Sequence, residues 1–168
     1  MKNKALSRDG FIIDQRELGD EPYGACASDY NGCGWIALFN FLRLIGRPLP
    51  PDAIKKALLS RSLLSGRLGT SPFAVQRFLK SSGIPARFAA GKKKAVRASL
   101  SARAGVLFYL HSRGLHYVAF ASDGDTLRFF NAISGKEDHR TDMAGFLKAH
   151  ALPLLVCCWT LKRDAASE

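Results

Sequence analysis

The cysteine at position 33 is the residue whose surroundings most favour chemistry. It lies in the run Asn31-Gly32-Cys33-Gly34, where a glycine-rich turn is expected to become an amphipathic helix. Unpaired backbone N–H groups and the helix dipole at such a position stabilise an anion and lower the pKa of a thiol below its usual value of ~8.5. The two glycines lack Cβ atoms, which would let a substrate carbonyl approach the backbone closely, where the N–H of Cys33 can point at a developing oxyanion. We therefore expect Cys33 to be a nucleophile.

A histidine and an asparagine follow this cysteine later in the chain. His116 opens an apolar strand and Asn131 closes the next one, with enough residues between them for one hairpin. The order cysteine, histidine, asparagine is that of a papain-type triad. His116 could instead be a structural histidine, and Asn131 a turn former. The other histidines lack such a setting and are expected to be surface or packing residues: His111, His139 and His150.

Apolar residues at helical spacing predict that the first half of the chain is mainly helical. Capping residues and prolines mark where these helices start, and glycines mark where two of them stop. The predicted helices run from Trp35 to Gly46, from Pro51 through Leu58, and from Pro72 to Gly83, with a last short helix after Thr141-Asp142 through Leu147.

After residue 85 the pattern changes to short segments that are rich in β-branched and aromatic residues and bounded by turns. These predicted strands cover residues 86–89, 105–110, 117–121, 127–130 and 154–161, with a tight hairpin at Asp123-Gly124-Asp125. The last strand could form an edge or pair with another copy. Helices first and an antiparallel sheet second is an α+β arrangement.

The length of 168 residues suits a single domain that spans the whole chain, 1–168. Residues 1–28 are expected to be mostly a loop lead-in, with a short strand at 11–13, because glycine, proline and aspartate punctuate them. Residues 162–168 are expected to form a flexible tail.

The three motifs together resemble the papain-like cysteine peptidase superfamily, most closely the small bacterial bacteriocin-processing domains of the double-glycine peptidase type. In that group a Cys-Gly at a helix start supplies the nucleophile, as Cys33-Gly34 would here. His116-Tyr117-Val118 is similar to the group's His-Phe-Val strand, and Asn131-Ala-Ile-Ser-Gly is similar to its Asp-Pro-Ala-x-Gly turn. The resemblance runs from about Asp29 to Gly135. It implies a papain-like fold, with a helical half that carries the cysteine and an antiparallel sheet half.

The resemblance also implies a role for each residue. His116 would draw the proton from Cys33 and later return it to the leaving group, while Asn131 would orient the imidazole and fix its tautomer. One departure concerns the oxyanion hole, because the family carries a glutamine six residues before the cysteine and this chain has Ala27 there. Ser28 or Asn31 could supply the missing donor if the loop is shifted, although Asn31 could equally stabilise the turn.

Composition restricts the location and the cofactors. Apolar residues make up 47% of the chain and charged residues 23%, as in ordinary globular proteins. No apolar run has the length of a signal peptide or the ~20 residues of a membrane span, so we expect a cytoplasmic protein. The four cysteines are too few for a disulfide scaffold and lack metal-ligand spacing, so no metal or other cofactor is expected. Cys157 and Cys158 lie in an apolar run where thiols serve as small buried hydrophobes.

The formal net charge is +11, from 25 Lys and Arg against 14 Asp and Glu. Such a field attracts anionic partners without identifying one. The densest cluster, Lys92-Lys93-Lys94, lacks the interleaved aromatic residues on which bases could stack. We interpret it as a solvated basic loop or helix face, and nucleic-acid binding is not expected.

The sequence therefore predicts a thiol hydrolase that cleaves a peptide or another amide through an acyl-enzyme on Cys33, with peptidase activity favoured. Acyl transfer, side-chain deamidation and isopeptide cleavage would use the same triad, and the sequence does not separate them. An alternative from another class is a catalytically inactive papain-like domain that binds a peptide or a partner protein in the same cleft. The absence of the family's glutamine favours this alternative.

Overall fold

The N-terminal stretch has more regular structure than the sequence indicates. The computed structural model describes residues 3–60, 67, 69–132 and 139–163. In place of a loop lead-in, residues 3–31 form short elements, namely η1 (Asn3–Ala5), η2 (Gln15–Leu18), the antiparallel pair β1 (Pro22–Tyr23) and β2 (Cys26–Ala27), and α1 (Ser28–Asn31). The strand predicted at 11–13 is reduced to a single bridge between Leu6 and Ile12.

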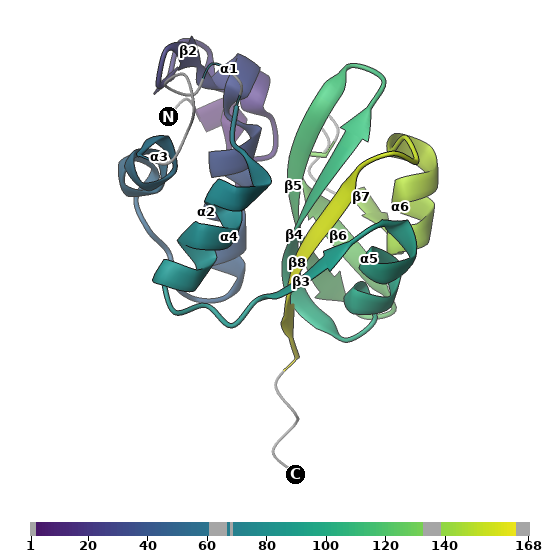
Figure 1. Ribbon diagram of the computed structural model, residues 1–168. Coiled ribbons are helices and arrows are strands. Elements are labelled where there is room, and N and C mark those ends of the chain that lie inside the picture. The colour runs from purple at the N-terminus through teal and green to yellow at the C-terminus, as the bar shows by residue number, and fades with distance from the viewer. Residues whose placement is uncertain (1–2, 61–66, 68, 133–138, 164–168) are drawn as a thin grey trace.

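Three longer helices follow, close to the predicted positions: α2 (Cys33–Leu44), α3 (Pro51–Leu59) and α4 (Pro72–Ser81). Every residue of α2 from Cys33 to Leu42 is buried, because this helix lies against the sheet and is flanked by the other helices (Figure 1). The hydroxyl of Ser71 caps α4 by accepting a hydrogen bond from the N–H of Ala74. Pro51 and Pro72 occupy first-turn positions, where a missing N–H costs nothing.

The second half of the chain builds a six-stranded sheet in which every neighbouring pair is antiparallel. The strands are β3 (Arg87–Ala90), β4 (Ala102–His111), β5 (Gly114–Asp123), β6 (Thr126–Phe130), β7 (His139–Thr141) and β8 (Val156–Lys162), in the order β3-β8-β4-β5-β6-β7. The hairpin predicted at Asp123-Gly124-Asp125 joins β5 to β6.

The last strand corrects two predictions. β8 lies between β3 and β4, so both of its edges are paired within the chain and it is not an edge strand. Lys162 belongs to this strand, and the N–H of Arg163 donates to the carbonyl of Ser101, so the chain is ordered beyond the predicted start of the tail. Residues 164–168 lie outside the described part of the chain.

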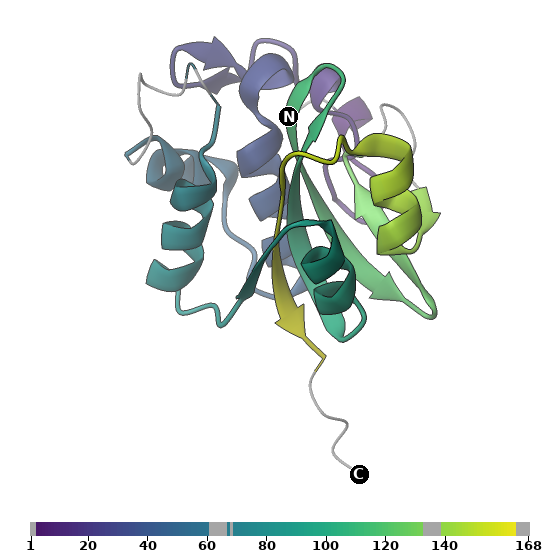
Figure 2. The ribbon, with the colours of Figure 1, turned by 45° about the vertical axis from the view of Figure 1, so that its right-hand side comes forward.

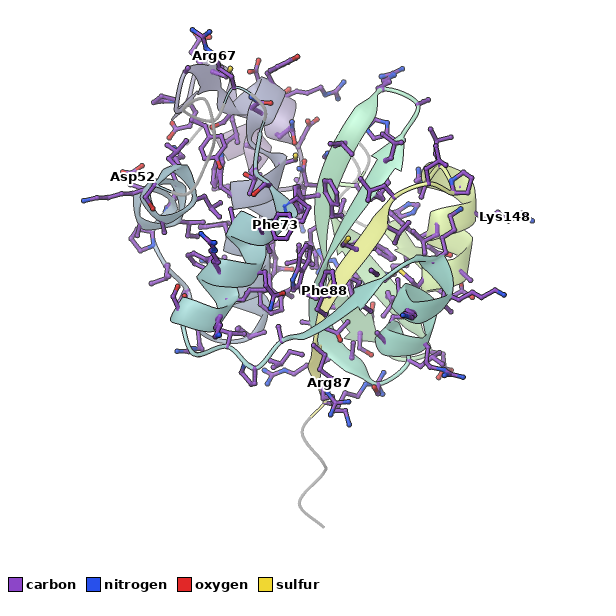
Figure 3. All side chains as sticks on the ribbon, viewed as in Figure 1. Asp52, Arg67, Phe73, Arg87, Phe88 and Lys148 are labelled. Carbon is purple, nitrogen blue, oxygen red and sulfur yellow. The ribbon has the colours of Figure 1, made fainter. Side chains whose placement is uncertain are left out.

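The helices and the sheet form three layers, with α2–α4 on one face of the sheet and two further helices on the other (Figures 1 and 2). Apolar side chains pack against both faces of the sheet. Between the α2–α4 side and the sheet lies one cluster, which includes Trp35, Phe108 and Tyr117. On the opposite face, α5 (Lys92–Ser99) and α6 (Met143–His150) cover a second cluster, in which the rings of Phe129 and Phe146 stack 4.0 Å apart. Side chains occupy the space between the layers (Figure 3). Burial of these large aromatic groups is the main force that holds the layers together.

The basic cluster at residues 92–94 begins α5, so it lies on a helix and is not a loop. The ammonium group of Lys92 donates to the carbonyls of Leu147 and Ala151 at 3.4 and 3.1 Å, where α6 ends. The Leu147 carbonyl also accepts from the N–H of Ala151, so the ammonium group is an additional donor at the end of α6, where a cation complements the helix dipole. The positive charge of Lys92 therefore stabilises the contact between α5 and the end of α6. Of the helices in the described ranges, none has both the length and the apolar character needed to cross a membrane.

Candidate active site

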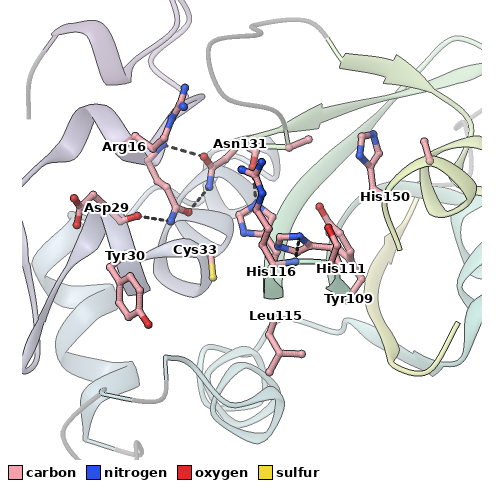
Figure 4. Close-up of a pocket in the computed structure, with 15 residues that line it drawn as sticks. Arg16, Asp29, Tyr30, Cys33, Tyr109, His111, Leu115, His116, Asn131 and His150 are labelled. Carbon is pink, nitrogen blue, oxygen red and sulfur yellow. Dashed lines mark hydrogen bonds between the residues drawn. The ribbon is translucent and has the colours of Figure 1, made fainter. Parts of the chain in front are cut away.

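The fold brings Cys33, His116 and Asn131 to one open pocket with a volume of about 880 Å³ (Figure 4). Cys33 is the first residue of α2, His116 lies near the start of β5, and Asn131 follows the last residue of β6. The pocket therefore lies where the helical layer meets one end of the sheet. Three residues that are distant in sequence converge there.

The thiol of Cys33 is largely buried, with a residue exposure of 9%. Burial raises its pKa to about 11, and hydrogen bonding from the backbone of Tyr117, Gly34 and Cys33 itself opposes this rise. The expectation that the helix start lowers this pKa is therefore wrong for the free protein, because desolvation outweighs the backbone N–H groups. The resting state of Cys33 at neutral pH is a thiol.

The imidazole of His116 has a defined orientation. Its Nε2 lies 2.8 Å from the main-chain carbonyl of Asn131, and because a carbonyl oxygen can only accept, Nε2 carries the proton. In the neutral ring, Nδ1 is then an unprotonated base. Burial lowers the pKa of His116, the Asn131 carbonyl partly opposes this, and His111 lowers it further. The edge of the ring meets Tyr109, with centroids 5.9 Å apart.

Asn131 contacts His116 through its backbone, whereas its side chain bonds to another residue. The side-chain Oδ1 accepts from the N–H of Gln15 at 3.0 Å, and Nδ2 donates to Oε1 of Gln15 at 3.1 Å. Within the described ranges Asn131 is the single non-glycine residue with a positive φ, at 60°. Asparagine tolerates this left-handed conformation better than most residues do.

Gln15 lines the same pocket and was missed by the sequence analysis. Besides its two bonds to Asn131, its Nε2 donates to the carbonyl of Asp29 at 2.8 Å (Figure 4). It thereby joins η2, α1 and the end of β6. The available sequence signal was Asp14, which caps η2 by accepting from the N–H of Arg16 and so marks Gln15 as the first residue of a short helix.

The two predicted oxyanion donors lie outside the pocket lining. The hydroxyl of Ser28 is fully buried and accepts from Nε1 of Trp35 at 3.1 Å. The Nδ2 of Asn31 donates to the carbonyl of Arg67 at 2.9 Å. Both side chains therefore make hydrogen bonds around the helix start, and neither lines the pocket in this structure.

The glycines on either side of Cys33 also have a structural explanation. A Cβ on Gly34 would lie 2.3 Å from Oγ1 of Thr70, and one on Gly32 would lie 2.3 Å from the carbonyl oxygen of Ser28. Thr70 is in turn fixed by a hydrogen bond between its hydroxyl and that of Tyr23, and by one that the hydroxyl of Tyr117 donates to its carbonyl. Close packing inside the protein, rather than room for a substrate, accounts for both glycines.

Other polar side chains give the pocket a largely basic and imidazole-rich rim. His111 and His150, expected to be surface or packing residues, line it together with Arg113. Burial is the first cause of the lowered pKa values of both histidines, and these shifts favour the neutral form of each ring. Across the described residues, no three His, Cys, Asp or Glu side chains form a group that could hold a metal ion.

Comparison with known proteins supports the fold. No protein-family model and no curated protein matches the chain. Among solved structures, it is similar to the peptidase domain of Streptococcus ComA, a bifunctional ABC transporter involved in a quorum-sensing pathway, with a TM-score of 0.55 and 14% identity over 80% of this chain and 94% of that domain. The predicted α+β, papain-like fold is therefore confirmed. At this identity the likeness concerns the fold alone.

Proposed function

We propose that this protein is a single-domain cysteine peptidase, or a related thiol-dependent amide hydrolase, with Cys33 as nucleophile and His116 as base. One observation carries the proposal: a cysteine at a helix start and a histidine with an unprotonated Nδ1 line the same open pocket. Their places in a papain-like fold are those that an acyl-transfer site of this kind requires.

In the proposed reaction, Sγ of Cys33 bonds to the carbonyl carbon of the substrate amide, and the thiol proton passes to Nδ1 of His116. The carbonyl π electrons move to oxygen, which becomes an oxyanion. When the C–N bond breaks, the imidazolium returns the proton to the departing amine and a thioester remains on Cys33. Attack by water, with His116 again as base, releases the acid and restores the thiol.

The raised pKa of Cys33 and the lowered pKa of His116 define the protonation state from which this reaction starts. The raised pKa of Cys33 keeps the thiol protonated at neutral pH, and the lowered pKa of His116 favours the neutral imidazole, in which Nδ1 can accept a proton. Proton transfer then accompanies attack on the substrate, instead of preceding it as a preformed ion pair. The backbone of Tyr117, Gly34 and Cys33 would stabilise the sulfur as charge develops on it.

A second candidate is a catalytically inactive domain that binds a peptide in the pocket. The raised pKa of Cys33 and the positions of Ser28 and Asn31 outside the pocket favour it. A domain of this kind would bind a peptide equally well after Cys33→Ala, whereas the peptidase would form no acyl-enzyme.

The two candidates are separated by covalent labelling of the nucleophile with electrophilic peptides. A peptide library with electrophilic C-terminal groups would be incubated with the wild-type protein, Cys33→Ala and His116→Ala, and the adducts would be located by peptide mass spectrometry. A cysteine peptidase gives an adduct on Cys33 that forms at least about a hundredfold more slowly in His116→Ala. Labelling of Cys33 that is independent of His116, together with no turnover of unmodified peptides, would support the binding domain.

A further inference from the structure

The hydrogen bond that orients the imidazole of His116 is accepted by a main-chain carbonyl. The residues that fix this section of backbone therefore determine the orientation of the ring. The carbonyl of Asn131 receives the Nε2 proton at 2.8 Å. The side chain of Asn131 makes no contribution to this hydrogen bond, since both of its polar atoms bond to Gln15. The direction of the carbonyl depends on the backbone conformation of Asn131.

That conformation is held from two sides. The φ of 60° at Asn131 turns the chain directly after β6, and the residue is buried, with an exposure of 6%. Its side-chain amide pairs with both the N–H and the Oε1 of Gln15. Gln15 is itself anchored by the bond from its Nε2 to the carbonyl of Asp29, two residues before the turn that leads into Cys33.

We propose that Gln15 is a positioning residue for the reaction. It holds Asn131 in the left-handed conformation, and the carbonyl of Asn131, not the Asn131 side chain, then fixes the Nε2–H tautomer of His116. This inference rests on the proposed function for its kinetic consequences. Through Asp29 the same glutamine links the histidine side of the pocket to α1 and the helix start that carries Cys33. The spacing between base and nucleophile thus depends on one side chain from η2.

A matched pair of substitutions tests which part of Asn131 acts. Asn131→Gly and Asn131→Ala both remove the amide and keep the carbonyl, but only glycine adopts a positive φ without strain. We expect the kcat of the Asn131→Gly variant to be about tenfold higher than that of the Asn131→Ala variant, while the KM values of the two are similar. If the amide itself oriented the ring, the two variants would be equally impaired, and that result would overturn the inference.

A double-mutant cycle tests the role of Gln15. Gln15→Met keeps the N–H bond to Asn131 and removes the two side-chain bonds, to Asn131 and to Asp29. We expect kcat to fall about tenfold, which lies within the range for the loss of one or two typical hydrogen bonds. In the Asn131→Gly background the same change should have an effect of less than about twofold, because the partner amide is already absent. A full tenfold effect in that background would mean that Gln15 acts directly on the substrate. Glu17→Gln, an exposed change on the same short helix, is the control.

Nitrogen NMR of the His116 ring gives a readout that does not depend on turnover. The wild-type protein and Asn131→Gly should show the Nε2–H tautomer, while Gln15→Met and Asn131→Ala should show a mixture of tautomers. An Nδ1–H tautomer in the wild-type protein would contradict the inference even if the enzyme is active. If the protein has no hydrolase activity, the proposed function fails, and the tautomer measurements still decide whether Gln15 positions His116.

Discussion

Two buried thiols, one at the start of α2 and one in β8, lie in surroundings that differ in solvent access and in the polar groups near the sulfur. The exposures of Cys33 and Cys158 are 9% and 0%, and burial raises the pKa of both. Cys158 pairs with Leu107 and Ala89 on the neighbouring strands and packs in the cluster under α5 and α6. It behaves as a small apolar side chain.

Cys33 differs in what reaches it. It lines an open pocket, and hydrogen bonding from the backbone of Tyr117 on β5 favours its anionic form. His116 directly precedes Tyr117 on the same strand. Burial alone therefore does not distinguish the two thiols. The difference lies in solvent access and in polar groups supplied by the opposite layer, and substitution of each thiol tests it.

The largest effect is expected from removing each thiol in turn. Cys33→Ala should lower turnover by more than about a thousandfold, because no other group can form the acyl-enzyme. Cys158→Ala should keep turnover and lower the free energy of unfolding by about 1 kcal/mol, since it leaves a small cavity in a packed layer. Peptide hydrolysis and denaturant unfolding measure the two quantities. Comparable turnover in Cys33→Ala and wild type would remove the distinction between the thiols.

The next effect concerns the proposed base, His116. His116→Gln should reduce kcat by about a hundredfold to ten-thousandfold, the usual contribution of general acid–base catalysis. The matched control is His139→Gln, which alters a histidine on β7 that lies outside the pocket lining. Steady-state kinetics of both variants against the same peptide would measure this. A loss of the same size in the control would point to general disruption of the sheet.

A smaller effect is expected in the pH dependence of stability. Both thiols have folded-state pKa values above the ~8.5 of an unfolded chain, so the native protein binds more protons than the unfolded chain above that pH. Their contribution is fully present below about pH 8.5 and is lost as the pH rises through the folded-state value, about 11 for Cys33.

Between pH 8.5 and 10 we expect each thiol to lower the free energy of unfolding by about 1 kcal/mol per pH unit. Chemical denaturation at pH 8 and pH 10 should therefore show a smaller loss in Cys158→Ala than in the wild-type protein. Buried tyrosines titrate in the same direction, so the difference between variants is the informative quantity. An equal loss in both proteins would show that Cys158 ionises normally in the folded state.

The smallest effect on turnover is expected at the two residues outside the pocket lining. Ser28→Ala and Asn31→Ala should change kcat by less than about threefold, whereas loss of an oxyanion donor costs about a hundredfold to a thousandfold. Ser28→Ala should still reduce the free energy of unfolding by about 1 kcal/mol, because Nε1 of Trp35 loses its acceptor. Kinetics and thermal unfolding of these variants measure both effects. A hundredfold loss of kcat in either variant would assign that side chain to the oxyanion hole.

Local patterns were sufficient for most of the fold. The apolar stripe of α2, the Ser71 cap of α4 and the Asp123-Gly124-Asp125 hairpin depend on neighbouring residues, so their positions could be read from the sequence. The helical character of the Lys92 segment could not, because its apolar positions are few and its contacts with α6 come from distant residues. The strand β7 could not be predicted either, because its three residues are too few to show an alternating pattern.

The sequence by itself determined the residue types available for chemistry, namely a cysteine at a helix start, a histidine on a strand and an asparagine at a turn. Only the tertiary structure decided how they are used. It raised the pKa of Cys33 by desolvation, directed Ser28 and Asn31 into internal hydrogen bonds, and gave the main-chain carbonyl of Asn131 to His116. Gln15 entered the site because η2 folds against the end of β6. Burial, hydrogen-bond partners and backbone conformation are set by residues far apart in the chain, so a local pattern cannot specify them.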